Sequence, residues 1–80
     1  MQILFFGRLS EVAQNMSIDK PDGVSDIEGL KLWLSGQDEA LSSALARAGN
    51  RVAVNKVMTT ENVPLGHEDE VAFMSPLSGG

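Results

Sequence analysis

The two most apolar strand-like segments of this sequence stand at its opposite ends, "ILFF" near the start and "VAFM" near the finish. Side chains alternate between the two faces of a strand, so Ile3 and Phe5 lie on one face of the first segment and Leu4 and Phe6 on the other. Apolar residues on both faces indicate a strand that is covered on both sides, by its own domain or by a partner. We therefore expect both segments at the centre of a sheet.

The last segment alternates in the same way, with Val71 and Phe73 on one face and Ala72 and Met74 on the other. Because the whole domain separates the two segments in sequence, we expect them to lie side by side and to pair in parallel.

The segment "VSDIEGLKLWLSG" carries the clearest helix pattern. Ser25 followed three residues later by Glu28 predicts a capping box, and Gly36 predicts the C-terminal end. Gly29 inside this helix costs up to about 1 kcal/mol relative to alanine, and we interpret it as a point of close packing against a strand. The inward face consists of three apolar residues at helical spacing, Ile27, Leu30 and Leu34.

Shorter patterns fill the rest of the chain. "RLSEVAQN" predicts two helical turns with Leu9, Val12 and Ala13 inward, and "MSIDKPDG" predicts a short strand and a turn. Residues 38–50 predict a second helix, whose apolar side consists of Leu41, Ala44, Leu45 and Ala48. Two further strands are expected around a hairpin turn at Asn55 and Lys56, because asparagine tolerates positive φ.

The expected order of elements is therefore β, short α, β, α, α, β, β, β. With the first and last strands central and a helix packed across one face, this order predicts an α+β fold with a mixed sheet, the β-grasp or ubiquitin-like roll. We expect one β-grasp domain over residues 1–75 and a flexible C-terminal tail over residues 76–80.

Composition limits the classes of partner. The 80 residues carry 11 acidic and 6 basic side chains, a net charge of −5, and the basic ones form no run. Nucleic acids and anionic membranes are bound chiefly by Lys and Arg, so neither is expected as a partner.

No apolar stretch has the length of a membrane span and no basic segment precedes "ILFF", so we expect a cytoplasmic protein without a signal peptide. The absence of Cys excludes disulfides and thiolate chemistry.

The sequence holds no residue pattern for catalysis or metal binding. Its one histidine, His67, lies in the acidic stretch "GHEDE", whose spacing matches no calcium or zinc motif. We interpret His67 as a solvated loop residue and the acidic residues as a solvated turn, the alternative being complementarity to a basic partner. Trp33 is interpreted as packing rather than as a ligand platform. We expect no metal, no permanently bound cofactor, and no catalysis by the domain alone.

A helix layer on one face of the sheet would leave the other face apolar. Leu4, Phe6 and Met74 would lie there, with Met58 as a further member, and such a patch marks a protein interface. We therefore expect Phe6, Met58 and Met74 to contact a partner beside the emerging tail.

The chain finishes on "PLSGG". Glycine has no Cβ, so a terminal pair adds almost no packing and loses much conformational freedom when it becomes ordered. Two interpretations remain open: a frayed terminus, or a thin arm whose final carboxylate enters a slot too narrow for side chains.

The start "ILFFGRLSE", the middle "VAVN" and the end "DEVAFMSPLSGG" resemble the small subunits of molybdopterin synthase, the sulfur carriers of molybdenum-cofactor biosynthesis. The resemblance implies that an E1-like enzyme uses ATP to adenylate the carboxylate of Gly80, which a sulfur donor then converts into a thiocarboxylate. It further implies a tail that enters the large synthase subunit, where the sulfur attacks cyclic pyranopterin monophosphate, and an assembly of two small and two large subunits. The inserted residues would be Pro76, Leu77, Ser78 and Gly79.

Three positions depart from the pattern of that family. Ser10 replaces a frequent Arg, which puts any ion pair there in doubt. Ser75 replaces the first residue of a Pro-Pro step, which predicts a less stiff start of the tail. Glu68 stands where relatives have Gly, so the turn either changes shape or holds Glu68 in a strained conformation.

Two other functions remain as alternatives. A thiamin-pathway sulfur carrier shares the diglycine end and the activation chemistry, although such carriers typically lack the proline of "SPLSGG". A ubiquitin-like modifier would instead join its C-terminus to lysines of target proteins.

Overall fold

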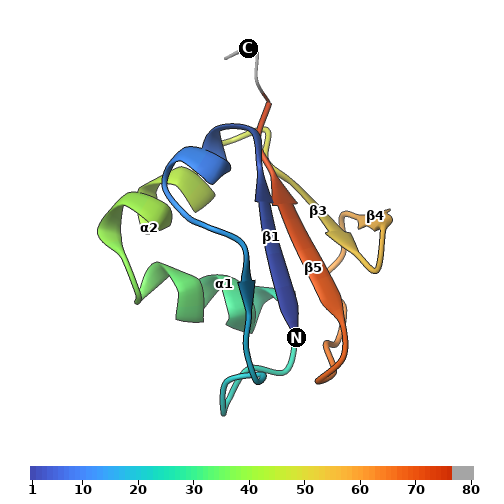
Figure 1. The fold of residues 1–80 in the computed structure, drawn as a ribbon. Coiled ribbons are helices and arrows are strands. Elements are labelled where there is room, and N and C mark those ends of the chain that lie inside the picture. Colours follow the sequence, from blue (N-terminus) through green and yellow to red (C-terminus); the bar gives the residue numbers. More distant parts are fainter. Residues whose placement is uncertain (77–80) are drawn as a thin grey trace.

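Parallel pairing of the two terminal strands organises the fold. The computed structural model describes residues 1–76, which form a five-stranded sheet in the order β2-β1-β5-β3-β4 (Figure 1). The strands are β1 (Gln2–Phe6), β2 (Met16–Ser17), β3 (Arg51–Val54), β4 (Val57–Thr59) and β5 (Glu70–Met74). β1 and β5 run parallel at the centre, and the other neighbouring pairs are antiparallel. The predicted central pair is confirmed.

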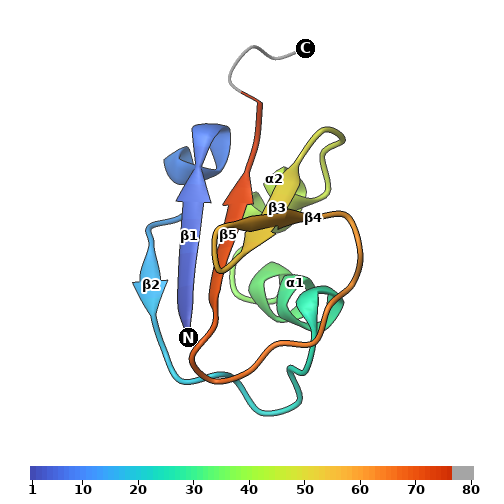
Figure 2. The ribbon, with the colours of Figure 1, turned by 90° about the vertical axis from the view of Figure 1, so that its right-hand side faces the viewer.

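Two helices cover one face of this sheet. α1 (Ile27–Ser35) and α2 (Glu39–Leu45) lie together on that face, and a short 3₁₀ helix, η1 (Gly7–Glu11), follows β1. Figure 2 looks onto the opposite face, with the helices behind the sheet. The predicted α+β fold, a mixed β-grasp sheet with helices on one face, is confirmed. Within residues 1–76, no helix has the length and apolar character needed to cross a membrane.

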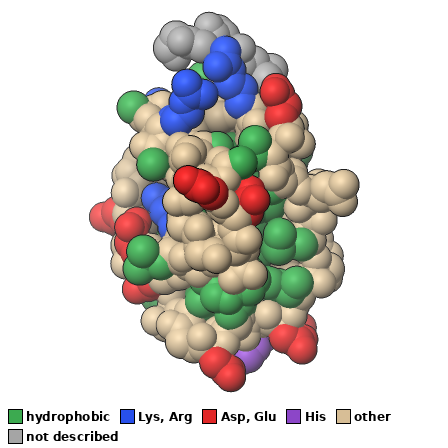
Figure 3. Space-filling view, turned by 90° about the vertical axis from the view of Figure 1, so that its left-hand side faces the viewer, with side chains coloured by type: hydrophobic (Ala, Val, Ile, Leu, Met, Phe, Trp, Pro, Cys, Tyr) green, Lys and Arg blue, Asp and Glu red, His purple; other side chains and the backbone are tan. Residues whose placement is uncertain are grey.

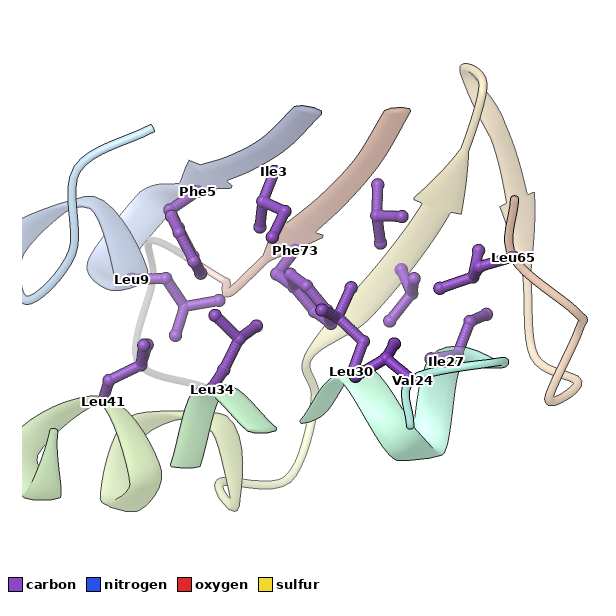
Figure 4. Packing of buried hydrophobic residues seen from close by; sticks show 12 residues of the cluster. Ile3, Phe5, Leu9, Val24, Ile27, Leu30, Leu34, Leu41, Leu65 and Phe73 are labelled. Atoms are coloured by element: carbon purple, nitrogen blue, oxygen red, sulfur yellow. The ribbon is translucent and has the colours of Figure 1, made fainter. Parts of the chain in front are cut away.

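The core fills the space between the helices and the sheet (Figure 4). Phe5 and Phe73 are directly opposite in the strand register and stack with ring centroids 5.9 Å apart. Leu30 and Leu34 of α1 are fully buried in the same cluster. Each such side chain contributes roughly 1.5–3 kcal/mol on burial, so this face of the sheet supplies most of the stabilisation.

α1 begins one residue later than predicted. Asp26 is the N-cap, because its Oδ1 accepts a hydrogen bond from the Gly29 N–H at 2.8 Å. The predicted capping box of Ser25 and Glu28 is wrong: the Ser25 carbonyl accepts from the Leu65 N–H at 2.9 Å, which keeps Ser25 outside the helix. The interpretation of Gly29 is also wrong, since a Cβ there would lie 3.1 Å from Asp26 Oδ1 and would meet no strand. Glycine leaves room for the cap.

α2 is shorter than its pattern predicts. Asn50 Nδ2 donates to the carbonyl oxygens of Ala44 and Leu45 at 2.9 and 3.2 Å. These are carbonyl groups that a helix end leaves without intrahelical partners. The helix therefore stops at Leu45, and Ala48, predicted on the inward side, is exposed beyond it.

η1 replaces the two helical turns predicted after β1. Leu9 is fully buried as expected, but Val12 lies beyond the 3₁₀ segment and is exposed. The predicted end of α1 at Gly36 is confirmed, since that residue is the C-cap.

The β3–β4 hairpin turns at Asn55 and Lys56, as predicted. Their φ angles are 51° and 70°, and positive values at both central residues define a type I′ turn. Asn55 also holds this turn against β5, because its N–H donates to the Glu70 carbonyl at 2.8 Å and its Oδ1 accepts from the Glu70 N–H at 3.0 Å.

Candidate functional site

The face of the sheet without helices carries apolar side chains in two rows across the strands. Directly opposite residues on neighbouring strands point to the same face, so the strand register defines each row. We term this surface the open-face patch; its rows are Leu4, Ala72, Ala53 and Met58, and then Phe6, Met74 and Arg51. Figure 2 views the sheet from this side.

Exposure varies across the open-face patch. Phe6 is 47% exposed and Met58 54%, whereas Met74 is half-buried. Ala53 and Ala72 are buried, since their small side chains lie between larger neighbours in the rows, and the patch therefore has a recessed centre. The predicted apolar surface is present at the three positions that the sequence nominated for a partner.

The tail leaves the domain directly beside the open-face patch. Ser75, the last residue of the predicted domain, and Pro76, the first of the predicted tail, are here termed the tail root. The Ser75 N–H donates to the Phe6 carbonyl at 3.3 Å, and Ser75 Oγ accepts from the Leu9 N–H at 3.2 Å. A proline at position 75 could make neither bond. The predicted loss of stiffness from Ser75 is therefore offset by two hydrogen bonds that hold the root against β1 and η1.

Two glycines with positive φ lie against the tail root. Gly7 has φ 68°, and a Cβ at this position would lie 2.2 Å from the Ser75 carbonyl oxygen. Gly49 has φ 91°, and its Cβ would lie 3.3 Å from Pro76 Cγ. Glycine at both positions lets the turn after β1 and the loop before β3 approach the departing chain closely.

Four of the nominated tail residues, Leu77, Ser78, Gly79 and Gly80, lie outside the described residues. The insertion of the tail into a partner and the chemistry at Gly80 therefore stay predictions.

The acidic loop before β5 is held by Asp69. Asp69 Oδ2 accepts from the Gly66 N–H at 2.7 Å, and Oδ1 accepts from Asn55 Nδ2 at 2.9 Å. These hydrogen bonds, the backbone one first, lower the pKa of Asp69 because they stabilise its ionised form. Glu68 is not among the non-glycine residues with positive φ, so the turn holds no left-handed strain at Glu68.

The other residues singled out in the sequence are exposed, packed against the core or hydrogen-bonded locally. His67 is exposed, and Trp33 is half-buried against the core. Ser10 Oγ donates to the Gly7 carbonyl at 2.6 Å, a local bond within η1. In the part of the chain that the structure describes, no three His, Cys, Asp or Glu side chains gather in the manner of a metal site.

Residue patterns alone did not identify three members of this site. Arg51 joins the open-face patch only through its register with Met74. Gly7 and Gly49 contact the tail root across long sequence separations. The sequence identified these glycines only as residues at the ends of predicted elements. The residues that each one contacts depend on the fold.

The described geometry suits recognition of a macromolecule. It combines a half-exposed apolar surface with a chain end that departs from the edge of that surface, over a domain whose core is closed. Such an arrangement can bind a protein beside the tail root.

Comparisons with known proteins agree with this geometry. The protein described as molybdopterin synthase sulfur carrier subunit from Escherichia coli (strain K12) is 28% identical over 80 residues, which cover 100% of this chain and 99% of that protein. Residues 3–80 match the model of the ThiS family. Because this match spans nearly the whole domain, the chain belongs to the ThiS family.

Proposed function

We propose that this chain is a sulfur carrier and the small subunit of a molybdopterin synthase, with the carboxylate of Gly80 as the group that carries sulfur. One observation carries the proposal: the tail root leaves the domain immediately after Met74, at the edge of the exposed open-face patch. Support comes also from the full-length similarity to a relative that is named as the sulfur carrier subunit of this enzyme.

The proposed cycle begins with activation of the terminus. A carboxylate oxygen of Gly80 attacks the α-phosphorus of ATP on an E1-like adenylating enzyme, and pyrophosphate leaves. A sulfide-level donor then attacks the acyl carbon and displaces AMP, which gives the thiocarboxylate. Adenylation is needed because a free carboxylate has no leaving group that sulfur can displace.

Delivery follows in the large synthase subunit. The thiocarboxylate sulfur is an anionic, polarizable nucleophile that replaces an oxygen substituent on a carbon of cyclic pyranopterin monophosphate, and water then cleaves the acyl–sulfur bond to restore the carboxylate. Two rounds supply both sulfurs of the dithiolene. The large subunit's pocket positions the sulfur and excludes water, so catalysis depends on the complex.

The open-face patch is the proposed contact with the large subunit, in an assembly of two copies of each subunit. Phe6, Met58 and Met74 give it large apolar side chains around the recessed alanines, without Lys or Glu, a composition favoured in interface cores. Methionine side chains adapt to irregular partners, which suits Met58 and Met74 to this role.

The tail is long enough to deliver sulfur into a neighbouring subunit. The five residues from Pro76 to Gly80 span at most about 17 Å when extended. This is enough to cross the wall of a neighbouring subunit, and glycines at the end would pass a narrow slot. ATP-dependent activation fits a cytoplasmic location.

A second candidate is a thiamin-type sulfur carrier, favoured by the ThiS family match itself. Both candidates share Gly80 and its activation, and they differ in the protein that accepts the sulfur.

The test is mass spectrometry of the full chain after incubation with ATP, sulfide and the adenylating enzyme of the same organism. We expect one sulfur to replace one oxygen at the C-terminus. The thiocarboxylated chain is then mixed with cyclic pyranopterin monophosphate and the large synthase subunit, or with thiazole synthase and its substrates. Formation of molybdopterin in the first mixture supports the proposal, and formation of thiazole alone would favour the second candidate.

Deletion of Gly80 is the matched control. We expect loss of sulfur transfer with nearly unchanged thermal stability, because the deletion moves the carboxylate back by one residue without touching the core. Lysine-linked adducts on other proteins, with no sulfur gain in the intact chain, would contradict both carrier functions and indicate a modifier.

A further inference from the structure

Three arginines lie close in sequence to the two glycines that contact the tail root. Arg8 follows Gly7, which lies against Ser75, while Arg47 and Arg51 stand two residues to either side of Gly49, which lies against Pro76. All three side chains are exposed. We term them the arginine collar.

The arginine collar lies on both sides of the departing chain. Arg8 and Arg47 line one hollow between η1 and the end of α2, on the helical side of the molecule. Figure 3 shows that side, where basic side chains gather at one end of the molecule. Arg51 lies opposite Met74 and so belongs to the open-face patch. A partner that takes the tail would therefore meet cationic groups on each flank.

This end of the molecule differs in charge from the rest. Half of the 6 basic residues stand here, in a chain whose net charge is −5. Glu11, which lines the same hollow as Arg8 and Arg47, is the acidic residue beside them. Among residues 1–76 the ion pair is Lys31 with Glu28, so the collar guanidinium groups stay available for an external anion.

The distance to the chain terminus indicates what that anion is. If the four residues that follow Pro76 extend into an enzyme, as the proposed function requires, they carry the Gly80 carboxylate and any nucleotide bound to it up to about 14 Å from the tail root. Carboxylates on a protein surface that borders the tail can instead reach the guanidinium groups directly. Arginine matches a carboxylate with two parallel hydrogen bonds, which gives such a contact orientation as well as strength.

We propose that the arginine collar is a docking surface for an acidic surface at the entrance of the tail slot on the adenylating enzyme. The proposal rests on the proposed function, which requires that enzyme. A carrier must meet its activating partner briefly in each cycle, and complementary charge accelerates association more than it prolongs the complex.

The experiment measures the association rate of the full chain with the purified adenylating enzyme of the same organism, by stopped flow over a range of salt concentrations. The collar variant is Arg8→Gln with Arg47→Gln. The matched control is Lys31→Gln with Lys56→Gln, which changes net charge equally on exposed or half-buried side chains away from the tail root. We expect the collar variant to associate about fivefold to tenfold more slowly at low salt, with most of the difference lost at high salt. The control should change the rate by less than about twofold.

Each outcome separates this inference from the proposed function. Equal slowing in both variants would show that only net charge matters and would overturn the docking surface. Slowing confined to association with the large synthase subunit would overturn the assignment of the partner. Wild-type chain that forms no thiocarboxylate would overturn the proposed function, whereas normal thiocarboxylation with an unaffected collar variant would overturn the docking surface alone. Thermal unfolding of each variant confirms that the fold is intact.

Discussion

Phe5 and Phe6 are neighbours with the same side chain, yet they lie on opposite faces of β1. Phe5 is 3% exposed and stacks on Phe73 in the core, while Phe6 is 47% exposed beside Met74. The helices make this difference, since both cover the same face of the sheet. The comparison teaches that apolar character in a central strand does not by itself indicate the core. One face of β1 stabilises the domain, and the other is free for recognition.

The largest expected effect comes from truncation of the two phenylalanines. Phe5→Ala should lower the free energy of unfolding by about 3–5 kcal/mol, because it leaves a cavity in a packed core. Phe6→Ala should cost less than about 1 kcal/mol, because half of its side chain already contacts solvent. Urea denaturation of both variants checks this. Equal losses would show that the open face is as much a part of the core as the helical face.

A substitution at Gly7, directly after β1, tests whether the contact with the tail root contributes to the stability of the fold. Gly7→Ala should cost about 2–3 kcal/mol, because the new Cβ meets the Ser75 carbonyl oxygen and the residue keeps a positive φ. Gly23→Ala is the control, since Gly23 also has positive φ but a Cβ there meets no atom within 4 Å. Similar losses in thermal unfolding would mean that the contact with Ser75 contributes nothing.

Phe6→Asp tests whether the open face of β1 contacts the partner. We expect binding to the large synthase subunit to weaken by at least about 2 kcal/mol, roughly 30-fold, because a charge would be buried in an apolar contact. Calorimetric titration measures the affinity, and circular dichroism checks the fold. Leu32→Asp is the control, since Leu32 is 76% exposed on α1, away from the open face. A variant of Phe6 that binds normally would exclude the open-face patch as the contact.

The smallest effect concerns pH and involves Asp69, in the loop before β5. The pKa of Asp69 is lowered in the folded chain by its hydrogen bonds to Gly66 and Asn55. The stabilisation is therefore complete above the unfolded pKa of about 4 and is lost as the pH falls through the lower folded value. Asp69→Asn should flatten the acid limb of a stability curve measured below about pH 4. Glu68→Gln, which removes the adjacent charge, should leave the acid-induced loss of stability unchanged. If Glu68→Gln reduced that loss and Asp69→Asn did not, Asp69 would not be the carboxylate responsible.

Much of the fold was predictable because its signals are local or are repeated along the chain. The alternation in β1 and β5 identified the central strands, and Asn55 marked the hairpin turn. The capping of α1 was not predictable in the same way. Ser25 and Asp26 are both good N-cap residues, and the choice between them depends on Leu65, which binds the Ser25 carbonyl from a distant loop.

Some residues of the candidate site were likewise predictable from the sequence, and others were not. Phe6, Met58 and Met74 were nominated from strand alternation, and the diglycine end is visible in the sequence. Arg51 and the contacts of Gly7 and Gly49 with the tail root were not, because each depends on residues more than 20 positions away. Sequence thus determined which side chains share a face of each strand, since that follows from the geometry of one extended segment. Only the tertiary structure decided which face the helices cover and what surrounds the departing chain, because those contacts join segments that are distant in sequence.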